Sequence, residues 1–168
     1  RRERACEARA HPGIEPLVER GLAELEHALE DLRVGEAVAP AAARVSALCH
    51  RVPVLDGHTE AVSVRLAGNP SLALVREVLA SFRSLPQELV LPSAPRVPIL
   101  LHDRPERPQP RLDLAESAEA TSGMTVHVGR VRECAVLGVK FALLGHNAER
   151  GAAGASLLNA ELAVATGW

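Results

Sequence analysis

The hydrophobic and polar positions of this chain follow two different periods, and each period predicts one kind of secondary structure. Val62, Val64 and Leu66 alternate with polar residues, which is typical of a strand with one buried face and one wet face. Pro53 is compatible with extended structure only at a strand edge or a bulge. Four further segments have extended character, at residues 44–54, 97–102, 124–128 and 136–144. We therefore expect five strands.

Apolar residues at helical spacing predict three helices. The first covers residues 14–32 and has a polar face rich in glutamate. The second begins at Asn69–Pro70, which fits an N-cap followed by proline at the first helical position, and it ends near Phe82. The third covers residues 150–166 and stops at Gly167, which is typical of a helix with a glycine end.

The order of these elements indicates an α+β fold. Strands that alternate, instead of being apolar throughout, favour a mostly antiparallel mixed sheet with helices packed on one face. A Rossmann unit is not expected, because no G-x-G-x-x-G motif follows a predicted strand and Gly151 and Gly154 have the wrong spacing. We divide the chain into a helix and alanine-rich linker over 1–43 and one domain over 44–168, whose proline-rich stretch is mainly ordered loop.

Composition removes several classes of function. A net charge of -2 and an apolar fraction of 47% favour neither a nucleic-acid partner nor intrinsic disorder. No segment approaches the roughly 20 apolar residues that span a bilayer, so we expect no membrane contact and a cytoplasmic protein. Three cysteines without a C-x-x-C pair predict neither disulfides nor a metal site. The chain begins with Arg1 instead of methionine, which is compatible with a truncated product.

Arg51 and His58 form the first candidate site. Arginine matches a carboxylate with two parallel hydrogen bonds, whereas histidine can exchange a proton near neutral pH. An odd separation along one strand would send the two side chains to opposite faces, but a turn at Asp56–Gly57 can let them converge. By itself such a pair is more commonly a surface ion-pair partner and a turn residue.

The residues around this pair resemble a family signature. Residues 45–59 read hydrophobic-Ser-x-x-Cys-x-Arg-hydrophobic and, four residues later, Gly-His-Thr. This resembles the active-site histidine signature of aspartate-semialdehyde dehydrogenases. Further segments resemble the archaeal and fungal branch of that family, and the resemblance covers roughly 44–162; these segments are Asn69–Ser71, Leu91–Pro95, Arg107–Asp113, Gly123–Met124, Val128–Arg132 and His146–Ser156.

The resemblance implies a fold and a reaction. It implies the carboxy-terminal domain of aspartate-semialdehyde and glyceraldehyde-3-phosphate dehydrogenases, acting as a homodimer on a small molecule. Arg51 would bind the substrate carboxylate, and His58 would be the acid/base that aids a cysteine thiolate. With NADP and phosphate, the family interconverts L-aspartyl 4-phosphate and L-aspartate 4-semialdehyde for lysine, threonine and methionine synthesis. The family's Asn-Cys nucleophile and nucleotide-binding glycine loop are not in these 168 residues.

Other residues receive weaker assignments. In the family the start of the last helix lies beside the nicotinamide, so the resemblance makes Asn147 and Gly151 candidate cofactor contacts. Asn147 as a plain N-cap, with Gly151 and Gly154 present for close packing, is an equal alternative. Cys49 is expected to be a buried, inert thiol, and no role is given to Cys6 or Cys134.

Two questions remain open at this stage. Residues Arg107–Asp113 form either a binding patch or, as the family favours, a rigid surface loop at the subunit interface. No ligand role is assigned to four histidines, at positions 50, 102, 127 and 146. Two alternative functions share the fold, namely an acyl-CoA reductase of the malonyl-CoA type and a non-catalytic dimerisation module.

Overall fold

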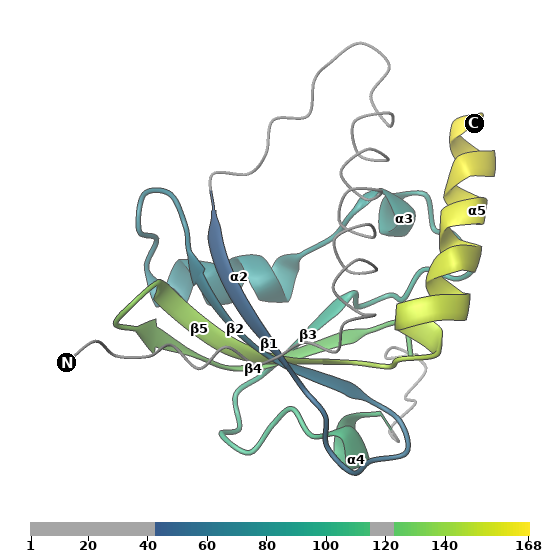
Figure 1. Ribbon diagram of the computed structural model, residues 1–168. Helices are drawn as coiled ribbons and strands as arrows, with labels where there is room; N and C mark the ends of the chain where they lie inside the picture. Colours follow the sequence, from purple (N-terminus) through teal and green to yellow (C-terminus); the bar gives the residue numbers. More distant parts are fainter. Residues whose placement is uncertain (1–42, 115–122) are drawn as a thin grey trace, which may run out of the picture. The chain divides into compact units, whose positions relative to one another are not determined.

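The structure is a computed structural model that describes residues 43–114 and 123–168, and five strands form one sheet in this part of the chain (Figure 1). The strands are β1 (Arg44–His50), β2 (His58–Arg65), β3 (Ile99–His102), β4 (Val126–Cys134) and β5 (Gly138–Gly145). Their order in the sheet is β1-β2-β5-β4-β3, and every neighbouring pair is antiparallel except the parallel pair β3 and β4. The expected α+β fold with a mostly antiparallel mixed sheet is confirmed.

The strand boundaries depart from the predicted ones at identifiable residues. The first strand ends at His50, ahead of Pro53, because proline cannot donate a hydrogen bond to a neighbouring strand. The fourth strand continues to Cys134, well beyond residue 128. Its ladder with β5 shifts register between Gly129 and Arg132, and Arg130 has a positive φ of 57°. This irregularity breaks the alternation that would have revealed the full strand.

The second helix, α2 (Leu72–Ser81), is capped by a different residue from the one expected. The Ser71 hydroxyl accepts a hydrogen bond from the Leu74 N–H, so the assignment of Asn69 as N-cap is wrong. Asn69 instead has a positive φ of 43° and follows a turn. The carboxy-terminal boundary at Phe82 is confirmed.

The last helical segment begins as a π-helical turn, η1 (Glu149–Ala153), and continues as α5 (Gly154–Thr166). Gly167 ends it with a left-handed φ of 81°, and its N–H reaches the carbonyls of Ala163 and Val164. The predicted glycine end is therefore confirmed. Two short helices interrupt the proline-rich loop, α3 (Leu85–Glu88) and α4 (Pro110–Asp113).

The two faces of the sheet have different partners. Val64 pairs with Val139, and both pack with Val75 of α2 in the core cluster. We call this the helix face; since side chains alternate along a strand, His58 and Glu60 of β2 lie on it too. The opposite face, which we call the loop face, carries Thr59, Leu144 and His127 and is covered by α4 with the loop before it.

Some sequence-based expectations concern residues outside the described part. The helix over 14–32 and the linker over 34–42 lie there, as does Cys6. The chain divides into two units at residues 41 and 42, and all the elements above belong to the second. Among the described residues, no helix is both long enough and apolar enough to cross a bilayer.

Candidate functional site

Arg51 and His58 lie where β1 ends and β2 begins. Residues 51–57 reverse the chain, so the reversal expected between the two residues is present. In the antiparallel ladder Cys49 faces Glu60 and His50 faces Thr59. Arg51 follows the last residue of this ladder and His58 is the first residue of β2, so the two lie at the same end of the β1–β2 pair. His58 is about half exposed there, and Arg51 is exposed.

His58 has a close carboxylate partner on its own strand. Its Nε2 atom lies 3.1 Å from Oε1 of Glu60, and the exposed fractions of the two side chains are 51% and 25%. Glu60 also faces Cys49 across the ladder, so one potential ligand atom from each of these three residues lies within 4.8 Å of the others. The site therefore combines a guanidinium, an imidazole, a carboxylate and a thiol.

Cys49 is exposed, so the expectation that it is buried is wrong. It lies on β1, the edge strand of the sheet. All the residues of this strand are exposed within the described part of the chain. Partial desolvation of the thiol, together with the charge and the hydrogen bond of Glu60, raises the pKa of Cys49 above its ordinary value. A raised pKa keeps the sulfur protonated near neutral pH, which agrees with the expectation that Cys49 is not a nucleophile.

The turn that leads into His58 is fixed from two distant parts of the chain. Gly57 has a φ of 111°, and a Cβ atom there would lie 2.7 Å from Leu114 Cδ1 and 3.0 Å from Pro110 Cβ. Only glycine fits this combination of backbone conformation and packing. The Gly57 N–H also donates a 3.0 Å hydrogen bond to Oδ1 of Asn147, 90 positions later. Both contacts hold the turn in register with the sheet.

Asn147 therefore does not have the capping role considered from the sequence. The first N–H groups of η1, those of Ala148 and Glu149, donate to Nδ1 of His146 at 3.2 and 3.3 Å. His146 is thus the side chain that caps this segment, a function that the sequence analysis missed. These two N–H groups are therefore not free to bind a ligand.

The two glycines near this segment differ. A Cβ atom on Gly151 would meet only the His146 carbonyl oxygen, at an ordinary 3.6 Å, so close packing does not require glycine there. The Gly151 N–H donates to that same oxygen at 3.0 Å. On Gly154 a Cβ atom would lie 2.4 Å from Sδ of Met124, so the close-packing explanation is confirmed for Gly154 alone.

A second polar cluster is buried on the loop face. Asp113 accepts hydrogen bonds from both Nε and an Nη atom of Arg107 and lies 3.4 Å from Nε2 of His102. The His102 and His127 rings stack with centroids 5.3 Å apart, and their facing nitrogens are 3.1 Å apart. Arg107 is therefore bound within this cluster, and the segment from Arg107 to Asp113 ends in the short helix α4.

Asp113 is charged within this cluster. Burial by itself raises its pKa, but the hydrogen bonds from Arg107 and the Gln109 N–H, with the charges of His102 and Arg107, outweigh burial and leave the pKa below the ordinary value. Asp113 and the two histidines form another group whose potential ligand atoms lie within 4.8 Å. Since Arg107 already neutralises the carboxylate, a metal cation would meet a fixed positive charge there.

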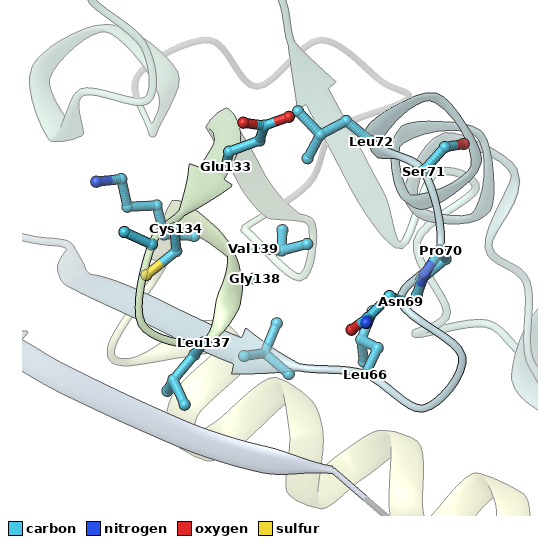
Figure 2. Close-up of a pocket in the computed structure, with 13 residues that line it drawn as sticks. Leu66, Asn69, Pro70, Ser71, Leu72, Glu133, Cys134, Leu137, Gly138 and Val139 are labelled. Atoms are coloured by element: carbon cyan, nitrogen blue, oxygen red, sulfur yellow. The ribbon is translucent and has the colours of Figure 1, made fainter.

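One cavity among the described residues lies away from both clusters (Figure 2). Its volume is about 750 Å³, and its lining includes Val64, Asn69, Cys134 and Lys140. Val64 is six residues beyond His58 on the same strand, so their backbone positions are roughly 20 Å apart. Hydrogen bonds from the backbone N–H groups of Leu137 and Val136 lower the pKa of Cys134. Size alone therefore does not identify the candidate site.

The family model described as "Semialdehyde dehydrogenase, dimerisation domain" matches residues 4–148. The chain belongs to this family. The match begins within residues 1–43, for which the sequence analysis found no family motif. Curated relatives named aspartate-semialdehyde dehydrogenase include that of Methanothermobacter thermautotrophicus, with 50% identity over 141 residues, and that of Archaeoglobus fulgidus, with 51% identity over 121 residues.

Solved structures agree with the family assignment. The structure of aspartate-semialdehyde dehydrogenase with NADP from Candida albicans has a TM-score of 0.60 and 43% identity, and the alignment covers 67% of this chain and 31% of that one. Aspartate-semialdehyde dehydrogenase II from Vibrio cholerae has a TM-score of 0.51 and 27% identity, with 68% and 29% covered. The alignments to the two archaeal relatives cover 83% and 72% of this chain, but only 39% and 33% of theirs.

Proposed function

We propose that this chain is the substrate-binding and dimer-forming part of an NADP-dependent aspartate-semialdehyde dehydrogenase. The reaction would interconvert L-aspartyl 4-phosphate and L-aspartate 4-semialdehyde. The observation that supports the proposal is that Arg51 directly follows β1 and His58 begins the paired strand β2, within the segment that resembles the family signature. The relatives with this name span more than twice the matched length, so the proposed activity belongs to a larger protein.

Arg51 is proposed to bind the substrate carboxylate. Its position directly after the end of β1 puts the guanidinium at an exposed end of the sheet, where a small anion can approach. The fork of N–H groups matches a carboxylate bidentately, which fixes the orientation of the bound molecule as well as its charge. The reacting end of the same molecule would then lie toward His58.

His58 is proposed to be the acid/base. Its imidazole would take the proton of a cysteine thiol as the thiolate forms and would return a proton later in the cycle. The resemblance places that cysteine in another part of the enzyme, in an Asn-Cys context that this chain lacks. Cys49 is a poor substitute, because its pKa is raised and its sulfur stays protonated.

Asn147 and Gly151 are proposed to contact the nicotinamide end of NADP, which when bound would accept the hydride. Oδ1 of Asn147 is already engaged by Gly57, so the amide NH₂ group is the part that suits a polar ligand. The Gly151 N–H is also engaged, and this residue would contribute only the space that a side chain would fill. The main nucleotide site would lie outside these 168 residues.

We propose that the domain forms a homodimer, as the family description of a dimerisation domain suggests. β1 supports this because Val45 and Leu48 are each more than 60% exposed on this strand at the edge of the sheet. A second copy of the chain would cover such apolar surface. Light scattering tests the point, and a monomer that persists at high concentration would count against it.

The proposed activity is tested in a chimaera. This chain replaces the matching 141 residues of the Methanothermobacter enzyme, which supplies the rest of the protein. We expect phosphate-dependent NADP reduction with aspartate semialdehyde, and a loss of about 10³-fold or more in kcat/KM with His58→Ala or Arg51→Ala. Glu77→Gln, on the exposed surface of α2, serves as the control.

Three outcomes would contradict the proposal in different ways. Activity that survives both substitutions would remove the roles of Arg51 and His58. A chimaera that reduces malonyl-CoA but does not act on aspartate semialdehyde would indicate the acyl-CoA reductase alternative. A folded, dimeric chimaera without activity toward either substrate would favour the non-catalytic module.

A further inference from the structure

We propose that Glu60 is a positioning residue that holds His58 in one tautomer and one orientation. The observation is the 3.1 Å approach of Glu60 Oε1 to His58 Nε2, made by two residues that are neighbours on the same face of β2. No motif in the sequence assigns a role to Glu60. Its catalytic consequence rests on the acid/base role proposed for His58, whereas the geometric claim can be tested without any activity.

Glu60 is better anchored than the histidine it faces. It lies within β2 and has ladder partners on both sides, Cys49 on β1 and Leu143 on β5. His58 is the first residue of the strand and follows the turn at Gly57. Since the Cys49 thiol also makes a hydrogen bond with Glu60, the carboxylate is held from two directions. The anchored partner therefore sets the orientation of the more exposed one.

A carboxylate accepts hydrogen bonds but does not donate them, and this decides the tautomer of His58. The nitrogen that faces Glu60 is Nε2, so in the neutral imidazole Nε2 carries the proton and Nδ1 keeps a lone pair. A proton that leaves a cysteine thiol would pass to Nδ1, giving a thiolate and an imidazolium. Glu60 then faces the new positive charge on the ring, and the return of the proton from Nδ1 restores the starting state.

The groups around His58 favour this arrangement. Glu60 contributes a negative charge from the same strand, Cys49 a neutral thiol from β1, and Arg51 a positive charge directly after the end of β1. The two charged residues would thus have separate tasks, because Arg51 would attract the anion and Glu60 would fix the orientation of the imidazole ring.

The alternative is an ordinary surface ion pair without consequence for the histidine. His146 provides an internal comparison, because its Nδ1 accepts two backbone N–H groups and its Nε2 must therefore carry the proton as well. The tautomer of His146 is set by backbone groups, and Glu149 lies 3.8 Å from its Nε2. Loss of a carboxylate should therefore change the tautomer of His58 and leave that of His146 unchanged.

The first test is nitrogen NMR of the histidine side chains in this chain, at a pH where the rings are neutral. We expect both His58 and His146 to have the proton on Nε2. Glu60→Gln should convert His58 to a mixture of the two tautomers, because an amide can either donate or accept, and Glu60→Ala should do the same. Glu149→Gln, with the same change of charge, should leave His58 unchanged. A His58 spectrum that is identical in Glu60→Gln, Glu60→Ala and the unaltered chain would overturn the proposal.

The second test measures the catalytic consequence in the chimaera. Glu60→Gln should lower kcat on the order of 10²-fold with a nearly constant KM, because substrate binding through Arg51 is retained. Added to His58→Ala, Glu60→Gln should cause no further loss, since it acts through that ring. If His58→Ala is active, the proposed function fails; if His58→Ala is inactive while Glu60→Gln has full activity, only the role of Glu60 fails.

Discussion

The domain contains two groups of histidine and carboxylate side chains, one on each face of the same sheet. On the helix face, His58 and Glu60 are close together at an open end, and the histidine is about half exposed. On the loop face, Asp113 and His127 are almost completely buried, and an arginine is bonded to the carboxylate. Residue types that look alike in a sequence therefore serve two different purposes.

The difference lies in what completes each group. The Asp113 carboxylate is buried and is bonded to Arg107 within the fold, so removing the arginine would take away a charge partner from a group that lies away from water. Glu60 and His58 have solvent on one side and can change charge or bind a ligand at little cost to the fold. We therefore expect substitutions on the loop face to reduce stability, and those on the helix face to reduce activity.

The largest expected effect is on the buried group. Asp113→Asn should lower the free energy of unfolding by about 3–5 kcal/mol, because the Arg107 guanidinium would lose the buried carboxylate to which it donates. Urea unfolding measures this. Asp103→Asn is the matched control, since the Arg76–Asp103 pair has the same chemistry at the surface, with Asp103 85% exposed, and should cost no more than about 1 kcal/mol.

The same variant has a defined pH dependence. The pKa of Asp113 is lower in the folded chain than in the unfolded chain. The ionised carboxylate therefore contributes its full stabilisation above about pH 3.9, the ordinary pKa of an aspartate, and this contribution is lost as the pH falls through the folded-state pKa. The gap in unfolding free energy between the unaltered chain and Asp113→Asn should therefore narrow on acidification below about pH 4. A gap of constant size down to the acid limit would contradict this account.

The next largest effect is expected at Gly57, in the turn that connects β1 to β2. Gly57→Ala should cost about 2–4 kcal/mol, because a Cβ atom is strained at a φ of 111° and would clash with Leu114 on the loop face. Gly68→Ala has a similar backbone requirement, with a φ of 73° and nothing within 4 Å, and should cost only about 1 kcal/mol. If thermal unfolding showed the same loss of stability for Gly57→Ala and Gly68→Ala, packing of α4 would not be what holds the turn.

The smallest expected effects are changes in unfolding free energy of opposite sign at two threonines. The Thr59 hydroxyl is buried on the loop face and has no hydrogen-bond partner among the described residues. Thr59→Val should therefore raise the free energy of unfolding by about 1 kcal/mol. Thr125→Val should lower it by about 1–2 kcal/mol, because the buried Thr125 hydroxyl donates to the Val97 carbonyl. If calorimetry showed that both substitutions change the free energy of unfolding in the same direction, this interpretation would be contradicted.

The sequence predicted the sheet well because alternation is a local property. Strands with one buried face, such as the segment around Val62, carry their own signal. The N-cap of α2 was missed because two residues of capping type, Asn69 and Ser71, lie only two positions apart. The turn at Gly68 takes Asn69 into a positive φ, and Ser71 caps the helix. Such competition is decided by backbone geometry that a linear pattern does not contain.

The candidate site was only partly predictable for a related reason. Arg51 and His58 lie within one short segment, so their motif could be seen in the chain. The Asn147 bond to Gly57 and the meeting of His102 with Asp113 depend on which strands become neighbours, and no local pattern encodes that. The pairing of β3 with β4 brings His102 beside His127, although no ligand role was assigned to either histidine from the sequence.

The hydrogen bond from Gly57 to Asn147 has a consequence for how the domain is assembled. Arg51, His58 and Glu60 lie within ten consecutive positions, but the acceptor that fixes their turn lies ninety positions beyond Gly57. A chain that ended before Asn147 would therefore carry these three side chains without the hydrogen bond that fixes their turn. Completion of the last strand is what converts a collection of functional groups into a defined geometry.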